Sequence, residues 1–238
     1  MKLLYLVPGP MDRMEIKRRQ EICNNFTSKN TEVIVEDTEG PLSIESSVEE
    51  SLVLGPLLKK IWLVQKDYNA IIIGCFGDPG LRGAREISNI PVIGPGEASM
   101  HFACLVGDDF SIITVLESTI HLAQEQVRLL GLESKLKSIR AINIPVLELE
   151  KNFNNIETFQ ELIEDIEKKD KSGSIILGCM SQAFLLLDER TKSRIPVINP
   201  VKVALKSVEL FVSLNIRPSP FSYPPANIGK LEAILGRR

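Results

Sequence analysis

Short runs of Val, Ile and Leu alternate along the chain with longer stretches in which apolar residues recur at helical spacing. Such runs, bounded by turn residues, are typical of strands that are buried on both faces of a parallel sheet. In the first part of the chain the predicted strands are residues 2–7, 32–36, 70–74 and 90–93. The alternation predicts an α/β protein in which helices cover both faces of the sheet.

In two of the predicted helices, the spacing of apolar residues indicates which face is buried. In the first helix, Ile22 and Phe26 stand four residues apart. In the helix after the second strand, the apolar positions are Val48, Leu52, Leu58 and Ile61, with Gln65 as a polar exception. Residues spaced by three and four lie on one side of a helix, so we expect these positions to face the core.

The strand pattern occurs twice along the chain. The segment Ala70–Cys75 (AIIIGC) is similar to Ser174–Cys179 (SIILGC), and Ile90–Ile93 (IPVI) is identical to Ile195–Ile198 at nearly the same offset. Upstream of the second copy, residues 111–116 and 139–144 correspond to the first and second strands. Two matching marks at one offset indicate an internal duplication.

The duplication predicts two pseudo-symmetric halves, each an open, flavodoxin-like parallel sheet with helices on both faces. We expect residues 1–96 together with 208–238 to form the first half, and residues 97–207 the second. Right-handed crossovers place strands one and three side by side at the centre of each half. Ligands in such sheets bind beyond the carboxyl ends of the strands, so we expect the active-site cleft between the halves.

The end of the chain departs from the repeat. Residues 201–214 have helical spacing, and we expect this helix to pack back on the first half. Beyond it, four prolines predict an extended arm before a short final helix: Pro218, Pro220, Pro224 and Pro225.

Two of the four cysteines stand at equivalent positions of the repeat. Cys75 and Cys179 each follow a glycine at the end of the third strand, so we expect both thiols to reach the cleft, one from each half. Two such thiols can act as base and acid on opposite faces of a carbon beside a carbonyl group. Cys23 and Cys104 lie inside predicted helices without a symmetric counterpart, and we interpret them as core residues.

Composition narrows the possible partners to a small-molecule substrate. A formal net charge of −3 over 238 residues gives no basic surface for nucleic acid. No apolar run has transmembrane length and the first ten residues lack a secretory layout, so we expect no membrane contact and a cytoplasmic protein with free thiols. Without a C-x-x-C pair and with two histidines, a metal site is not expected.

The residues after each cysteine offer further contacts to a substrate. Phe76, Gly77 and Asp78 begin a turn whose N–H groups can point inward, and Met180 and Ser181 follow the second thiol at a predicted helix start. We expect these amides to stabilise a thiolate and to hold the oxygen of a developing enolate. Asp78 is also a candidate for contact with the substrate, although a turn of this kind uses Asp for its own hydrogen bonds, which is the interpretation we favour.

Other polar side chains are less specific. Thr114 ends the strand equivalent to strand one, and its hydroxyl either reaches the cleft or bonds to the local backbone. Arg82 and Arg85 are interpreted as a solvated helix face, and His101 and His121 as ordinary helix positions.

At the two cysteine regions the sequence resembles the Asp/Glu/hydantoin racemase superfamily, and within it the hydantoin racemases most of all. The resemblance is carried by residues 39–45, 73–81, 84–86, 91–94, 96–98, 177–179 and 196–198. It implies cofactor-independent racemisation of a 5-substituted hydantoin by Cys75 and Cys179, with no cofactor and no metal, in a homo-oligomer. It also implies that Ile44, in the loop after strand two, contacts the substrate.

Two segments depart from the family pattern, and other functions stay open. The turn at residues 7–12 lacks the Asn-Pro-Asn-Thr-like side chains of the family, and residues 180–182 replace small residues after the second cysteine. The alternatives within the superfamily are an amino-acid racemase, a maleate-type isomerase or a decarboxylase, and outside it a two-lobed ligand sensor without turnover. Neither cysteine has a neighbouring histidine to assist proton removal beside a carboxylate, which favours the hydantoin.

Overall fold

The computed structural model describes residues 1–149, 155–186 and 192–236, and they contain two four-stranded parallel sheets. The first sheet consists of β1 (Lys2–Val7), β2 (Glu32–Asp37), β3 (Ala70–Ile73) and β4 (Val92–Ile93). The second consists of β5 (Phe110–Thr114), β6 (Leu136–Ala141), β7 (Ile175–Leu177) and β8 (Val197–Ile198). Their strand orders, β2-β1-β3-β4 and β6-β5-β7-β8, are the same, which confirms the predicted α/β fold of two equivalent halves.

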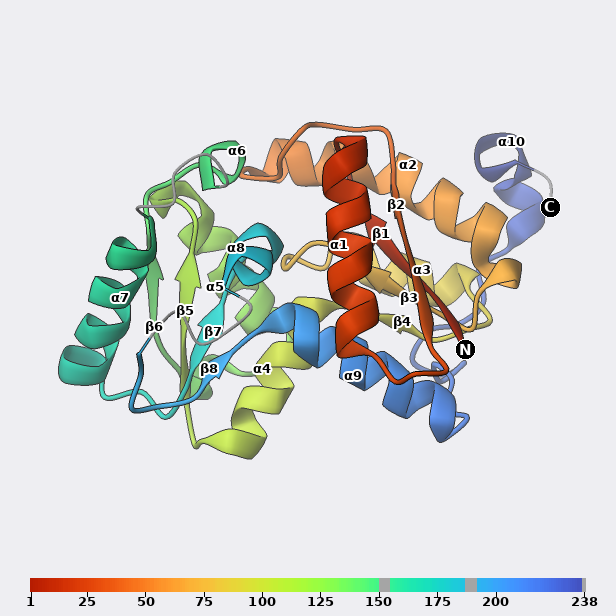
Figure 1. Cartoon of the computed structure of the whole chain (residues 1–238). Coiled ribbons are helices and arrows are strands. Elements are labelled where there is room, and N and C mark those ends of the chain that lie inside the picture. The colour runs from red at the N-terminus through yellow and green to blue at the C-terminus, as the bar shows by residue number, and fades with distance from the viewer. Residues whose placement is uncertain (150–154, 187–191, 237–238) are drawn as a thin grey trace.

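Helices cover the faces of both sheets (Figure 1). The α-helices are α1 (Arg13–Phe26), α2 (Ser47–Val64), α3 (Leu81–Ile87), α4 (Pro95–Val106), α5 (Ile120–Leu129), α6 (Val146–Leu149), α7 (Asn155–Asp165), α8 (Met180–Leu185), α9 (Pro200–Ser213) and α10 (Glu232–Leu235). Short 3-10 turns occupy Gln65–Asp67, Glu117–Thr119, Glu133–Lys135 and Ile228–Lys230, and a π-helical turn, Ile166–Asp170, follows α7. No helix among the described residues is long and apolar enough to cross a membrane.

Local sequence explains where these elements begin and end. Asp12 caps α1 by accepting hydrogen bonds from the N–H groups of Met14 and Glu15, and Asn199 caps α9 in the same way. The fourth strand of each sheet is shorter than predicted, because Pro91 and Pro196 precede it and have no N–H to donate to a ladder.

The structure corrects the predicted face of α2. The helix forms as expected and Ile61 is buried as predicted, but Val48 and Leu52 are 68% and 62% exposed. Its buried residues are Val53, Leu57, Ile61 and Trp62. Apolar residues stand on nearly every side of this helix, so spacing alone did not identify the buried stripe. Gln65, predicted as a polar exception, is buried and bonds to the backbone of Ile87 and Asn89.

Two long helices join the halves at their base. The α4 helix leaves the first sheet and α9 returns from the second, and the two pack against each other (Figure 1). Helix α9 also packs on β3, β4 and α1, as expected for a helix that returns to the first half. The predicted domain limits at residues 96/97 and 207/208 fall inside α4 and α9.

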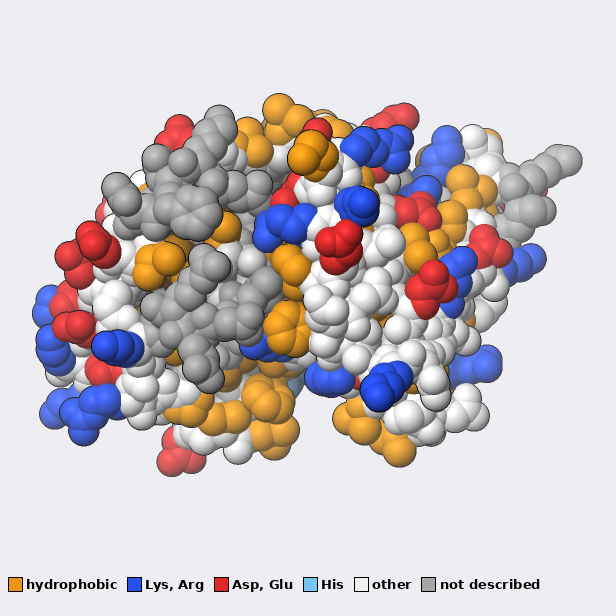
Figure 2. All heavy atoms as spheres, in the orientation of Figure 1, with side chains coloured by type: hydrophobic (Ala, Val, Ile, Leu, Met, Phe, Trp, Pro, Cys, Tyr) orange, Lys and Arg blue, Asp and Glu red, His pale blue; other side chains and the backbone are white. Residues whose placement is uncertain are grey.

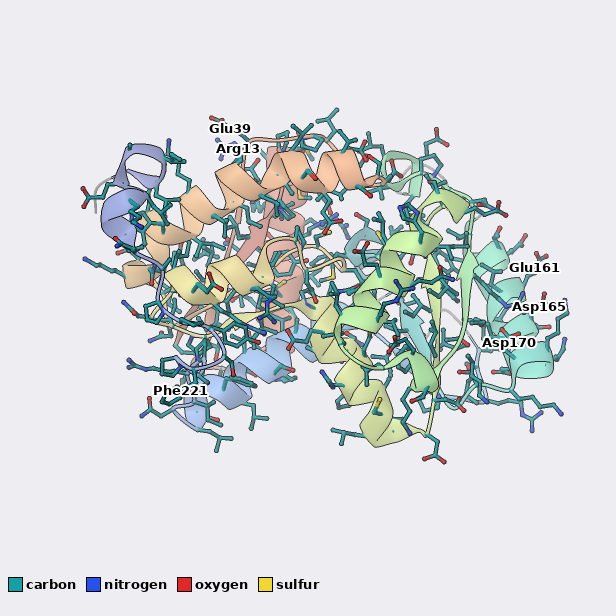
Figure 3. The ribbon with its side chains drawn as sticks, turned by 180° about the vertical axis from the view of Figure 1, so that it is seen from behind. Arg13, Glu39, Glu161, Asp165, Asp170 and Phe221 are labelled. Atoms are coloured by element: carbon teal, nitrogen blue, oxygen red, sulfur yellow. The ribbon has the colours of Figure 1, made fainter. Side chains whose placement is uncertain are left out.

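The tail lies against the first half. Tyr223 accepts a hydrogen bond from Arg85, and the Trp62 indole N–H donates to the carbonyl of Gly236. Arg85 therefore does not belong to a solvated face as predicted: its side chain is mostly buried, and it pairs with Glu97 at 2.8 Å. Phe221 of the tail is 95% exposed and points away from the body of the protein (Figure 3).

Charged side chains of both signs are interspersed over the visible surface (Figure 2). On the outer edge of the second half, Arg140 of β6 pairs with Asp165 at the end of α7 and with Asp170 at the end of the π-helical turn (Figure 3). Such pairs support the local packing of helix on sheet and contribute little to stability individually.

Candidate active site

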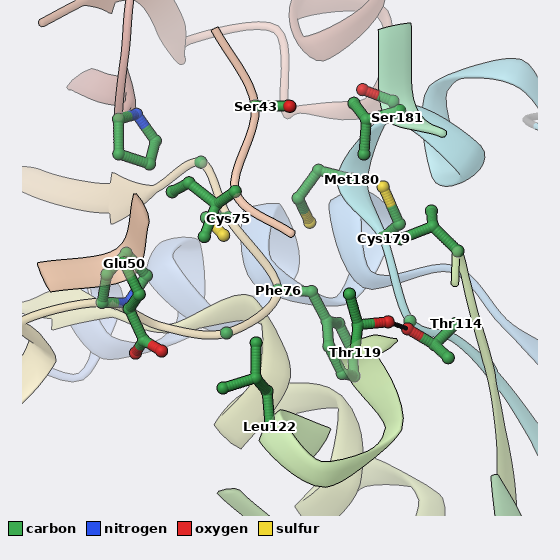
Figure 4. Close-up of a pocket in the computed structure, with 18 of the residues that line it drawn as sticks. Ser43, Glu50, Cys75, Phe76, Thr114, Thr119, Leu122, Cys179, Met180 and Ser181 are labelled. Carbon is green, nitrogen blue, oxygen red and sulfur yellow. Dashed lines mark hydrogen bonds between the residues drawn. The ribbon is translucent and has the colours of Figure 1, made fainter. Parts of the chain in front are cut away.

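A cavity of about 350 Å³ lies where the two halves meet, beyond the carboxyl ends of the strands. The central strands of each sheet end at it, with Val7 at the end of β1, Gly74 after β3, Thr114 at the end of β5 and Gly178 after β7. Figure 4 shows the pocket with its walls from both halves. The equivalence of the two sheets is therefore continued in the walls of one shared cavity.

Cys75 and Cys179 both line this cavity, and Figure 4 shows them on opposite sides of it. Each comes directly after a Gly whose N–H donates to the neighbouring central strand, Gly74 to the Leu6 carbonyl and Gly178 to the Ile113 carbonyl, both at 2.7 Å. The same local geometry thus presents one thiol from each half.

The glycine before each cysteine is required by close packing. A Cβ added at Gly74 would lie 2.6 Å from the ring of Tyr5, and one at Gly178 would lie 2.9 Å from the carbonyl oxygen of Ile113. Real side chains do not approach so closely, so only glycine lets the strand end beside its neighbour and turn the next residue into the cavity.

Most of the other predicted contact residues line the same cavity. They are Ile44, Phe76, Gly77, Thr114, Met180 and Ser181. The Thr114 hydroxyl lies 2.7 Å from that of Thr119, which in turn donates to the Leu116 carbonyl, so Thr114 combines a place in the wall with a local hydrogen bond.

Asp78 is the exception among the predicted contact residues, and its contact with the substrate stays a prediction. Asp78 is absent from the described lining of the cavity. Its carboxylate accepts hydrogen bonds from the N–H groups of Gly96 and Glu97 at the start of α4, and from the side chain of Gln126. Its φ of 53° is left-handed, which Asp tolerates better than most residues. Asp78 holds the turn after Cys75 against α4.

Burial dominates the acidity of the two thiols. It raises the pKa of Cys75 to about 12, and it also raises the pKa of Cys179. The backbone N–H of Gly77 opposes the shift at Cys75, and those of Ser181 and Gln182 oppose it at Cys179. The amides lower the two pKa values as expected. Burial raises them by more, so both thiols are less acidic than a free cysteine.

Several lining residues were not found from the sequence. Ser43, Glu50, Thr119 and Leu122 come from loops and helices of both halves (Figure 4). Ser43 lies in the loop at residues 39–45, and no motif marks the other three. Arg19 is the most notable of these residues, because it lies on α1, far from either cysteine in sequence, and its side chain is almost fully buried. A buried arginine needs partners, but the sequence of an amphipathic helix does not reveal which Arg turns inward.

No group of three or more His, Cys, Asp or Glu side chains that could hold a metal ion occurs within residues 1–149, 155–186 and 192–236. His101 and His121 lie on α4 and α5 with exposed side chains, in keeping with ordinary helix positions.

Two equivalent parallel-sheet halves, each presenting one thiol to a common cavity, are the architecture of a racemase. The chain belongs to the Asp/Glu/hydantoin racemase family, whose model matches residues 17–208. It is therefore an isomerase of the racemase class.

Individual relatives agree with this membership. The hydantoin racemase of Pseudomonas sp. (strain NS671) is 30% identical over 240 residues, which cover 98% of this chain and 96% of the relative. The hydantoin racemase of Paenarthrobacter aurescens is 30% identical over 78% of this chain and 80% of its own length. Among solved structures, an allantoin racemase from Klebsiella pneumoniae matches with a TM-score of 0.87 at 30% identity, covering 98% of both chains.

Proposed function

We propose that this protein racemises a 5-substituted hydantoin or a related cyclic ureide by proton transfer between Cys75 and Cys179. One observation carries the proposal: two thiols at equivalent positions of the two halves line opposite sides of one cavity. A carbon held between them can lose a proton to one sulfur and gain a proton from the other on its opposite face.

The reaction balances within the pair of thiols. One cysteine, as thiolate, removes the proton from C5 of the ring, and the electron pair of the broken C–H bond moves into the adjacent carbonyl as an enolate. The other cysteine, as thiol, then delivers its proton to the opposite face of C5 and is left as thiolate. The substrate leaves with inverted configuration, and the two cysteines have exchanged protonation states, ready for the reverse reaction.

The walls of the cavity favour an uncharged ring over an amino acid. Apolar side chains form much of the lining, among them Ile44, Phe76, Leu122 and Met180. Apart from the cysteines, the ionisable side chains in the described lining are Arg19, Glu50 and Glu125. The guanidinium of Arg19 is already bound by Glu15, and burial raises the pKa of Glu50, so the cavity offers poor compensation for the carboxylate and ammonium of an amino acid.

Both relatives named for hydantoin and the one named for allantoin fit this chemistry, because allantoin is itself a hydantoin with a ureido group on C5. The proposal therefore concerns the ring and its C5 proton. The side chain on C5 is the variable that a substrate panel has to decide.

The test is decay of optical rotation with single enantiomers of alkyl- and aryl-substituted hydantoins and allantoin, beside aspartate and glutamate. We expect turnover of ring substrates and not of the amino acids. Cys75→Ala and Cys179→Ala should each lower the rate by about 10²–10⁴-fold, since each removes one proton-transfer group. Cys104→Ala is the matched control and should keep the parent rate. A parent rate in either of the first two variants would refute the proposal.

A further inference from the structure

Arg19 crosses from the first half to the second at the edge of the cavity. It lies on α1, and its side chain is 4% exposed. Its Nη2 donates to the Ser181 hydroxyl at 3.0 Å, two residues after Cys179, and its guanidinium stacks on the ring of Phe184 with 4.7 Å to the centroid. A cation on one half is thus fixed beside the thiol of the other.

Glu15 keeps this guanidinium in place. It accepts from Arg19 Nε at 2.6 Å and also pairs with Arg18, which is half exposed and lies on the solvent side of the same helix. Because Glu15 binds both arginines, it keeps a cationic partner when either one is removed. This arrangement offers a matched pair of arginines on one helix, of which only Arg19 lines the cavity.

The two thiols therefore have unequal electrostatic surroundings. Burial and Glu45 oppose the charged form of Cys179, and the N–H groups of Gln182 and Ser181 together with Arg19 favour it. Cys75 has one supporting N–H, from Gly77, and the carboxylates of Asp78 and Glu50 both oppose its ionisation. Tyr5 is buried between the halves and interacts electrostatically with both thiols. The two thiols also interact with each other.

We propose that Arg19 is a positioning residue that makes Cys179 the first of the two thiols to ionise. The inference rests on the proposed function in one respect, which is that the thiol pair does the chemistry. It assigns the protonation states of the substrate-free enzyme, in which Cys179 is the thiolate base and Cys75 the thiol acid. The enantiomer whose C5 proton faces Cys179 can therefore react without a prior proton exchange. The duplicated fold is symmetric, and Arg19 breaks that symmetry.

The experiment is alkylation of the substrate-free protein by iodoacetamide at a series of pH values, with the initial rate at each cysteine measured by mass spectrometry of its peptide. The pH midpoint of each rate gives an apparent pKa that is independent of how easily the reagent reaches the sulfur. Low occupancy keeps the partner thiol unmodified, as coupled titrations require.

In the parent protein we expect Cys179 to titrate at a lower pH than Cys75, so that a larger fraction of it is thiolate at any given pH. Arg19→Met should raise the midpoint of Cys179 towards that of Cys75, and Arg19→Lys should restore part of the difference. Arg18→Met should leave both midpoints unchanged. If Arg19→Met does not fold, Ser181→Ala removes one hydrogen bond that holds the guanidinium beside Cys179 while the charge stays, and it should give a smaller rise at Cys179.

Equal midpoints in the parent protein, or a Cys179 midpoint that does not respond to Arg19→Met, would overturn the assignment. Neither result depends on turnover, because no substrate is present. The racemase proposal is decided separately by the rates of the cysteine variants, so the two can fail independently.

Discussion

At the scale of single residues, the feature that matters most is a thiol placed at the wall of the cavity between the halves. A thiolate there loses much of its hydration, and burial accordingly raises the pKa of both Cys75 and Cys179. A sulfur with a raised pKa is a strong base when it is ionised, which suits proton removal from carbon. The cost is that a small fraction of the thiol is ionised at neutral pH.

This environment predicts how the rate depends on pH. With both pKa values raised, the thiolate fraction should grow tenfold per pH unit through the neutral range, so kcat at saturating substrate should rise about tenfold per unit between about pH 6.5 and 8. The measurement is a kcat–pH profile, with circular dichroism at each pH to verify that the fold is unchanged. A plateau below about pH 8 would contradict the buried-thiol description.

The sequence identified both thiols for a physical reason that the structure supports. Each follows a glycine whose Cβ would collide with a neighbouring strand, so Gly-Cys at the end of a buried strand marks a backbone that turns a side chain outwards. Arg19 gave no such mark, because its role depends on the packing of α1 against α8 across the two halves. Asp78 forms the hydrogen bonds expected of a turn residue, and its contact with the substrate stays a prediction.

At the scale of elements, strands were more predictable than helix faces. The buried runs of Val, Ile and Leu located the strands to within a few residues, since continuous apolar runs of that length have few alternatives. Helix α2 was different, because leucines stand on several of its sides and spacing favoured the wrong stripe. The buried residues of α2 are decided by its packing against β1, β3, α3 and α10.

The corrected face of α2 makes a paired prediction. Leu57 is fully buried and Leu52 is 62% exposed, although both lie on the same helix. Leu57→Ala should lower the free energy of unfolding by about 2–5 kcal/mol, because it leaves a cavity in the core. Leu52→Ala should change it by less than about 0.5 kcal/mol. Urea denaturation of the two variants checks this, and equal losses would contradict the orientation of the helix.

At the scale of the whole molecule, the duplication explains why one cavity has two similar walls. Hydrogen bonds cross between the halves around it: the side chain of Gln126 donates to the Phe76 carbonyl, and the N–H of Val146 donates to Glu45. With α4 and α9 packed together at the base, these bonds fix the distance between the two walls. A reaction that needs groups on opposite faces of one carbon requires such a fixed spacing.

Some features of the whole molecule stay predictions. The homo-oligomer is one of them. Exposed apolar side chains gather at the far ends of α4 and α9 (Figure 2), among them Leu105, Val106 and Leu214, and this surface is a candidate for a contact between subunits. The substituent on C5 is another, because cavity walls built from loops such as residues 42–47 differ in ways that strand patterns do not encode.

The central claim is that two groups on opposite faces exchange the proton, and isotope incorporation tests it most directly. A single enantiomer of a hydantoin substrate is incubated with the enzyme in deuterated water, and the two enantiomers are separated during the first few per cent of conversion. Two thiols predict deuterium at C5 of the product and none above the enzyme-free rate in the remaining substrate. Equal label in both enantiomers would mean that one group serves both faces, and would contradict the account.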